Sequence, residues 1–290
     1  MIREVAFGQY YPTKSVIHRL DPRLKIILSL AYMVATIFLV NSFFCYALLS
    51  LFLLSVIAVS KIPLISVFKS VKAILFLALF TAVINIFFIK GNAEELLVDW
   101  WIFKIYSSGL ISAGRMVFRL ILLVMGASML TLTTTPVDLT YGIESLLSPL
   151  KLIKVPVGDF ALVMSITLRF IPTLMEETDR IIRAQKARGA QFDTGGMVAR
   201  AKAFVPILVP LLVNSFRRAE ELAMAMNARC FEGSTKRTRL KKLIFLWRDL
   251  FALLIFVLIV GFAVAVNYIN SDWLVNFIGK PLFDILFFDR

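Results

Sequence analysis

Long uncharged stretches dominate the pattern of hydrophobic and polar positions along the chain. Residues 26–60 form a run of 35 without a charged side chain. Crossing the hydrocarbon core of a bilayer takes about 20 residues, so this run predicts two helices joined by a tight turn at Asn41 and Ser42. Three further apolar stretches follow, at residues 73–89, 120–137 and 250–271. The pattern therefore predicts five membrane-spanning helices.

Between residues 138 and 242 the pattern changes to an amphipathic one. Apolar side chains recur at three- and four-residue spacing through residues 160–188, with charged side chains on the opposite side, as in an amphipathic helix. A second unit covers residues 197–229 and contains Pro206 and Pro210, which we expect to break or kink it. This region predicts long helices that lie along the membrane surface.

Composition fixes the fold class as an all-α integral membrane protein. Of the 290 residues 59% are hydrophobic, whereas a soluble domain has about 45–50%. We expect the following organisation: an N-terminal arm at 1–25, four spanning helices within 26–137, a cytoplasmic helical region at 138–242, a final spanning helix within 243–271 and a short tail at 272–290.

The distribution of charge predicts the orientation in the membrane. The formal net charge is +13, and residues 176–242 alone hold 14 basic and 7 acidic side chains. The N-terminal arm and the connection around Lys61, Lys69 and Lys72 are also basic. Because cytoplasmic loops are enriched in lysine and arginine, we expect the N-terminus in the cytoplasm and the C-terminus outside. Membrane topology then accounts for most of the positive charge, and we expect no nucleic-acid partner.

Residue types that carry catalysis are sparse. The two cysteines, Cys45 and Cys230, give no disulfide framework, and a single histidine, His18, gives no metal cluster. A phosphate-binding loop is also absent: residues 109–114 have its glycine spacing, but arginine and methionine follow them. We therefore expect a non-enzymatic chain without a cofactor, metal or catalytic site.

Two short basic segments stand out in the amphipathic region. Their arginines, Arg188 and Arg229, lie 41 residues apart, and each stands between small residues and follows an acidic stretch. Two interpretations remain open at this point. The arginines contact anionic lipid headgroups, or they project into pockets on a pair of related soluble partners. The six residues of these segments are Ala187, Arg188, Gly189, Ala228, Arg229 and Cys230.

These segments resemble the paired X-Arg-X motifs of the transmembrane T component of energy-coupling factor (ECF) transporters, a family that imports vitamins and transition-metal ions. Cys230 departs from the glycine of many relatives. The opening of the chain is also similar to that of the family, and the resemblance extends over nearly the whole sequence. The residues that carry the similarity at the opening are Gly8, Gln9, Tyr10, Tyr11, Pro12, Ser15, His18, Leu20, Asp21, Pro22, Arg23 and Lys25.

The resemblance implies three kinds of partner besides the lipid bilayer. Two cytoplasmic ATP-binding subunits hydrolyse ATP, a separate membrane S component binds the substrate, and the T component links them in the cell membrane. Arg188 and Arg229 would enter grooves on the two ATPases and face acidic side chains there. The family's T component need not encode the cargo, because one T component can serve several S components.

We also expect an interface with the substrate-binding partner. Arg115 and Arg119, which this pattern places near the outer end of the fourth span, either belong to that interface or snorkel to lipid headgroups. Five of the ten methionines lie in the amphipathic region, and flexible thioethers suit surfaces that repack against a moving partner. Met164 and Met175 are the two that we assign to this interface.

Two other functional classes remain as alternatives. A permease subunit of a conventional ABC importer would line the substrate path itself, but it usually presents one coupling segment, whereas this chain has two. A membrane enzyme acting on lipids would need clustered aspartate or histidine at the membrane interface, and the acidic residues here are scattered. Asp21 and Pro22 have an ordinary structural interpretation, as the N-cap and first residue of the first helix.

Overall fold

The computed structural model describes residues 10–38, 43–88, 96–100, 103–190, 192, 196–231, 233 and 245–268. The chain divides into two compact units. We call Tyr10–Thr135 with Leu243–Arg290 the bundle unit, and Met1–Gln9 with Pro136–Lys242 the long-helix unit.

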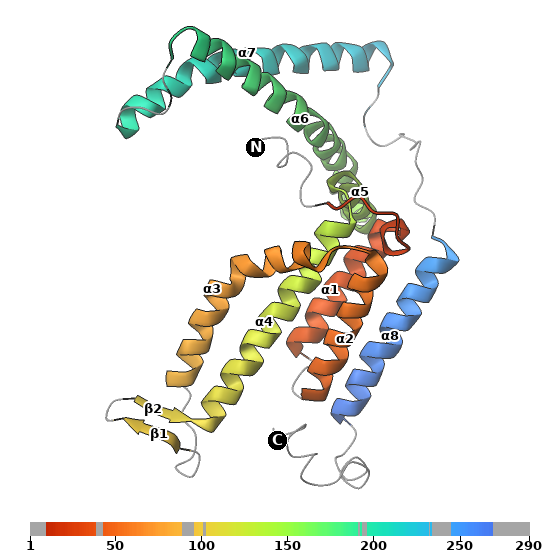
Figure 1. Cartoon of the computed structure of the whole chain (residues 1–290). Helices are drawn as coiled ribbons and strands as arrows, with labels where there is room; N and C mark the ends of the chain where they lie inside the picture. Colours follow the sequence, from red (N-terminus) through yellow and green to blue (C-terminus); the bar gives the residue numbers. More distant parts are fainter. Residues whose placement is uncertain are drawn as a thin grey trace. The chain divides into compact units, whose positions relative to one another are not determined.

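Helices of the bundle unit pack side by side (Figure 1). Helix α4 contacts α1, α2 and α3, while α8 contacts α1 and α2. Tyr32, Leu49, Met125 and Phe256 are among the buried side chains of the core that these helices share. The elements are the 3₁₀ helix η2 (Ile17–Arg19), α1 (Pro22–Phe38), α2 (Phe43–Ser60), α3 (Leu64–Phe88), β1 (Leu96–Trp100), β2 (Phe103–Tyr106), α4 (Ser107–Thr133) and α8 (Trp247–Tyr268).

The exterior of the bundle is apolar, as a lipid-facing surface must be. Leu51, Phe76 and Leu258 each leave 63% or more of their surface exposed. Exposing such large apolar side chains to water is energetically unfavourable, whereas in a bilayer they contact hydrocarbon. The all-α membrane class predicted from the sequence is therefore confirmed. The antiparallel hairpin of β1 and β2, which pairs Leu96 with Tyr106 and Trp100 with Phe103, is an element that the sequence pattern did not predict.

The described helices provide three candidate spans, or four at most, where the sequence pattern predicted five. By length and composition, three of the described helices can cross a membrane: α4, α6 (Val157–Ala187) and Trp247–Ala265 of α8. A fourth is α3 if its two segments, which meet at 55°, form one span. The first two predicted spans correspond to the shorter helices α1 and α2, and the predicted turn at Asn41 and Ser42 lies outside the described residues.

The start of α1 is joined to the start of α8 by a buried aspartate. Asp21 caps α1, because its Oδ1 accepts a hydrogen bond of 2.9 Å from the backbone N–H of Arg23, so the predicted N-cap is confirmed. Asp249, which is 1% exposed, accepts the backbone N–H of Asp21 at 2.9 Å and that of Leu246 at 2.8 Å. The carboxylate of Asp249 thus serves the starts of both helices, although it is 228 residues from Asp21 in the sequence.

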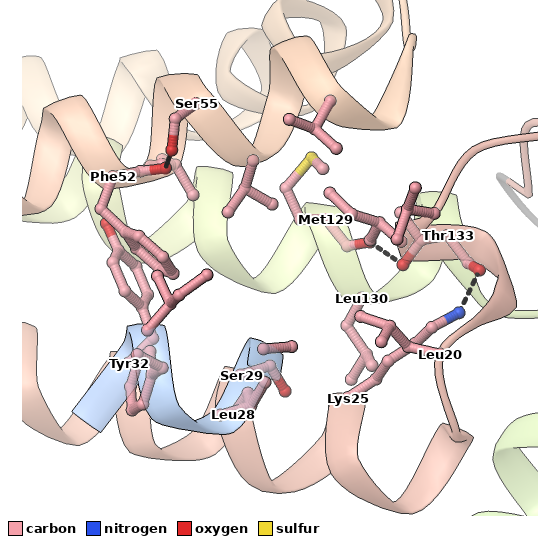
Figure 2. A pocket seen from close by; sticks show the side chains of 18 of the residues that line it. Leu20, Lys25, Leu28, Ser29, Tyr32, Phe52, Ser55, Met129, Leu130 and Thr133 are labelled. Atoms are coloured by element: carbon pink, nitrogen blue, oxygen red, sulfur yellow. Dashed lines mark hydrogen bonds between the residues drawn. The ribbon is translucent and has the colours of Figure 1, made fainter. Parts of the chain in front are cut away.

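Lys25 makes the corresponding connection to the end of α4. Its buried ammonium group donates hydrogen bonds to the carbonyl oxygens of His18 at 3.1 Å and Thr133 at 2.9 Å. Figure 2 shows this contact beside a largely apolar cavity of about 400 Å³, which Tyr32, Phe52 and other side chains of α1, α2, α4 and α8 line. A carbonyl at a helix C-terminus lacks an intrahelical partner, and Lys25 supplies one.

The segment before α1 crosses the ends of α4 and α2. The N–H of Tyr11 donates to the carbonyl of Leu132 at 3.0 Å, and the hydroxyl of Thr13 donates to the carbonyl of Ser60 at 3.2 Å. His18 holds this segment in shape, because its Nε2 donates to the carbonyl of Tyr11 at 3.0 Å. In that tautomer Nδ1 accepts a hydrogen bond of 2.7 Å from Ser15.

We expect the substitution Asp249→Ala to lower the thermal stability of the purified protein in detergent. It leaves the buried N–H of Asp21 without an acceptor, at a cost of about 1–3 kcal/mol. Asp249→Asn keeps one acceptor oxygen and should cost less, while Arg248→Ala, at the exposed neighbouring position, is the control. Equal melting temperatures for Asp249→Ala and Arg248→Ala would contradict the proposed role of the carboxylate.

We also expect stability to fall as the pH drops through the acidic range. Partial burial, with Lys25 nearby, lowers the pKa of His18 below its usual 6.5. The folded protein therefore favours the neutral ring of His18. The contribution of this ring to the free energy of unfolding is complete above pH 6.5 and is lost as the pH falls through the folded-state pKa. Melting curves between pH 7.5 and 5 should show a smaller decrease for His18→Gln, and an identical decrease would exclude His18 as its source.

Candidate functional site

The long-helix unit consists of two helices of similar length preceded by shorter segments. Its elements are α5 (Pro136–Leu146), the 3₁₀ helix η4 (Ser148–Ile153), α6 (Val157–Ala187) and α7 (Met197–Ala228). Pro206 and Pro210 lie inside α7, which continues through both of them. Of the two outcomes expected at these prolines, a break or a kink, the break is therefore excluded. A proline removes one backbone hydrogen bond, and the intact turns on both sides hold this helix together.

Helix α6 ends in a Schellman motif whose C-cap residue is Arg188. The N–H of Gly189 donates to the carbonyl of Lys186, and that of Ala190 donates to the carbonyl of Gln185, both at 3.0 Å. Gly189 has φ +87°, the left-handed conformation that this motif requires and that glycine adopts without strain. The backbone itself thus satisfies the last carbonyl groups of α6.

Helix α7 ends in the same motif, with Arg229 at the C-cap. The N–H of Cys230 donates to the carbonyl of Asn227 at 3.0 Å, and that of Phe231 donates to the carbonyl of Met226 at 3.1 Å. Cys230 takes the left-handed position with φ +53°. A residue with a Cβ is strained there, by roughly 1–2 kcal/mol, so the departure from glycine at this position has a conformational cost.

The two arginines therefore occupy equivalent positions. Each is an exposed C-cap residue at the end of a helix of 31 or 32 residues. Backbone N–H groups make the two hydrogen bonds that define each Schellman motif, so neither motif depends on a guanidinium. Each can therefore bind a partner, and a planar guanidinium pairs bidentately with a carboxylate or a phosphate.

Helices α6 and α7 cross and contact each other, as Figure 1 shows. At the contact, Nη2 of Arg218 lies 3.0 Å from Oε2 of Glu177, and the amide of Asn214 donates to Oε1 of the same glutamate. Nearer the tip of α6, Phe192 is buried and its ring centroid lies 5.9 Å from that of Phe204 in α7. Sequence reasoning missed this polar crossing, because the charged residues along a helix do not reveal which residues of another helix they meet.

Arg115 and Arg119 lie well inside α4, which corrects their predicted place near the outer end of a span. The helix begins at Ser107, 13 residues before the uncharged stretch that starts at residue 120, so Arg119 is about 18 Å along it at 1.5 Å per residue. Its Nε donates to the hydroxyl of Tyr46 in α2 at 3.1 Å. The ring of Phe118 packs edge-on against Tyr46, with centroids 5.8 Å apart. Arg119 thus has a protein contact near the middle of α4.

The structure brings together some of the predicted site residues and not others. Each tip triplet forms one helix end, whereas the two methionines assigned to the substrate-subunit interface, Met164 and Met175, are both half-buried positions on α6. Arg115 and Arg119 belong to the other unit. Within the described residues, no three His, Cys, Asp or Glu side chains gather as metal ligands do.

Comparison with known proteins identifies the family of this chain. Residues 13–240 match the CbiQ family, described as cobalt transport protein. An energy-coupling factor transporter transmembrane protein EcfT from Ruminiclostridium cellulolyticum is 48% identical over 269 residues, 93% of this chain and 99% of that protein. The chain belongs to the EcfT family. Proteins of the same name from Clostridium kluyveri and Bacillus subtilis are 51% and 44% identical, over 87% and 86% of this chain and 93% of each relative.

Membership in the EcfT family makes the chain a transmembrane component of an ECF transporter and a multi-pass membrane protein. The opening that resembled this family has a structural explanation here. Its residues Asp21 and Lys25, with His18, hold the ends of α1, α4 and α8 together. Asp249, which completes this cluster, was missed because it stands in the first turn of α8, where its sequence neighbours give no sign of Asp21.

We expect Cys230→Gly to stabilise the end of α7. Glycine adopts φ +53° without the strain of a side chain, so the last turn should gain roughly 1 kcal/mol, about a fivefold slower amide exchange in hydrogen–deuterium exchange. The reverse change, Gly189→Cys, is the matched control, since a Cβ at Gly189 meets no atom within 4 Å and adds conformational strain alone. It should accelerate exchange at the end of α6. Unchanged exchange in both variants would contradict the strain assignment.

Proposed function

We propose that this chain is the scaffold and energy-coupling subunit of an ECF-type importer. It transmits the ATP-driven motion of two cytoplasmic ATP-binding subunits to a separate membrane subunit that binds the substrate. The observation that carries this proposal is the equivalence of the two helix ends: two exposed C-cap arginines, each presented by a Schellman motif. Two equivalent tips suit two related partners.

Each tip arginine enters a groove on one ATPase and pairs with an acidic side chain there. Arginine fits this role better than lysine, because its fork makes two hydrogen bonds to one carboxylate and stays charged. Closing of the ATPase pair moves the tips, and α6 and α7 transmit the movement as long helices. The chain itself carries out no catalysis and holds no cofactor in this scheme.

A second surface binds the substrate-binding subunit. We assign Arg115 and Arg119 of α4 to this surface in the bundle unit, and Met164 and Met175 of α6 to separate contacts made by the long-helix unit. An arginine within the hydrocarbon core is costly unless it faces protein, and the bond from Arg119 to Tyr46 favours a protein contact over snorkelling to headgroups. The cargo is a vitamin or a transition-metal ion. The N-terminus lies in the cytoplasm, which places the basic segments on the cytoplasmic side.

Replacing the tip arginines tests the proposal. Truncating one partner of a desolvated charge pair costs roughly 2–5 kcal/mol, so Arg188→Ala and Arg229→Ala should each reduce substrate uptake and slow ATP turnover in the assembled complex. The double variant should release the ATPases or nearly abolish uptake while still inserting into the membrane. Lysine should restore activity only in part.

Arg217→Ala is the matched control, because Arg217 is exposed and pairs within its own helix with Glu221 at 3.4 Å. Normal uptake by the double alanine variant would rule the proposal out. Full activity of the double lysine variant, with the ATPases still bound, would favour lipid headgroups as the partners of the arginines. Co-purification also separates the alternatives, since a conventional ABC permease would bring an ATPase without a membrane S component.

A further inference from the structure

The contact between α6 and α7 joins two residues that occupy equivalent positions along their helices, counted from the helix ends. The helices end 41 residues apart, at Ala187 and Ala228, and the same offset relates Arg188 to Arg229. Applied to Glu177, this offset gives Arg218. These two residues form the ion pair at the crossing.

In a symmetric dimer, a residue that contacts the equivalent residue of the other subunit lies on the two-fold axis. Glu177 and Arg218 touch in this way although both belong to one chain. The corresponding residues at this contact differ in charge: Glu176 and Glu177 of α6 correspond to Arg217 and Arg218 of α7. Opposite charges at corresponding positions attract, whereas two identical residues of either charge would repel each other.

The crossing divides both helices at the same distance from their tips. Eleven residues separate Glu177 from Arg188, and eleven separate Arg218 from Arg229. At 1.5 Å per residue both arms are about 16 Å long, and eleven residues make about three complete turns. Each tip arginine therefore has the same reach and the same rotational setting relative to the crossing.

Burial makes the contact suitable for fixing this geometry. The side chains of Glu177 and Arg218 are 17% and 37% exposed, whereas those of the intrahelical pair Arg217 and Glu221 are 75% and 60% exposed. Asn214 of α7 binds the second oxygen of Glu177, so this carboxylate has two contacts to the opposite helix. An exposed pair contributes little to stability, while a partly buried carboxylate with two partners has a restricted orientation.

We propose that Glu177 and Arg218 are positioning residues, forming the pivot that sets the spacing of the two tip arginines. The functional consequence of this inference rests on the proposed function, in which the two tips engage two ATPases. The spacing itself is a property of this chain alone. The pivot and the coupling role can therefore be tested separately.

Spin labels on the full-length chain in lipid nanodiscs measure the spacing directly. Lys186→Cys and Asn227→Cys give labelling positions that are exposed, correspond by the same offset and lie outside both triplets. Cys45 is buried and Cys230 is exposed, so the background carries Cys45→Ala and Cys230→Gly. With the native pivot, electron–electron resonance should give one narrow distance distribution.

Charge changes at the pivot should widen this distribution or shift it. Glu177→Gln and Arg218→Gln each remove the ion pair, and the swapped double variant Glu177→Arg with Arg218→Glu restores it in the opposite sense. We expect a broader distribution for each single variant and a return to a narrow one for the swap. Arg217→Gln with Glu221→Gln is the matched control and should leave the distribution unchanged.

In the assembled transporter, each single variant should lower uptake per ATP hydrolysed by roughly 2- to 30-fold, the range that residues along a coupling path produce, while the ATPases remain bound. The swap should restore most of this ratio. If the swapped double variant fails to insert, the two glutamine variants decide between the outcomes. A native distance distribution in both glutamine variants would overturn the pivot, whatever the tip-arginine experiments show.

Discussion

The structure depends on how the backbone groups at helix ends find partners. The last four carbonyls and first four N–H groups of a helix have no partner within it, and in or near a bilayer water is a poor substitute. In the bundle unit, Asp249, Asp21 and Lys25 serve the ends of α1, α4 and α8. In the long-helix unit, the Schellman motifs after Ala187 and Ala228 do the same with backbone atoms alone.

These two solutions lead to different functional properties. In the bundle unit, Lys25 and Asp249 are buried and form hydrogen bonds with backbone groups. These two side chains therefore stabilise the fold and are not available to partners. At the tips, the backbone makes the cap, and Arg188 and Arg229 are exposed. These two exposed positive charges stand at the points where, in our proposal, the chain meets the ATPases.

Sequence reasoning reached the fold class, the family resemblance and the N-cap at Asp21, because each follows from local composition or spacing. It placed Arg115 and Arg119 near the outer end of the fourth span, because the uncharged stretch begins only at residue 120, whereas α4 begins at Ser107 and holds both arginines within it. It could not pair Glu177 with Arg218 or Asp21 with Asp249. Such pairs join residues far apart in the chain, and only the packing of whole helices decides which of many charged side chains meet.

Site-specific photocrosslinking from the two tips tests the central claim most directly. A photoreactive amino acid at Ala190 or at Phe231, each two residues beyond a tip arginine, should crosslink to an ATP-binding subunit in the intact transporter. Our account predicts that the two positions capture the two different ATPase subunits, and that the same probe at Leu254, an exposed position of α8, captures neither. Crosslinks from both tips to lipid alone, or to one and the same ATPase subunit, would contradict it.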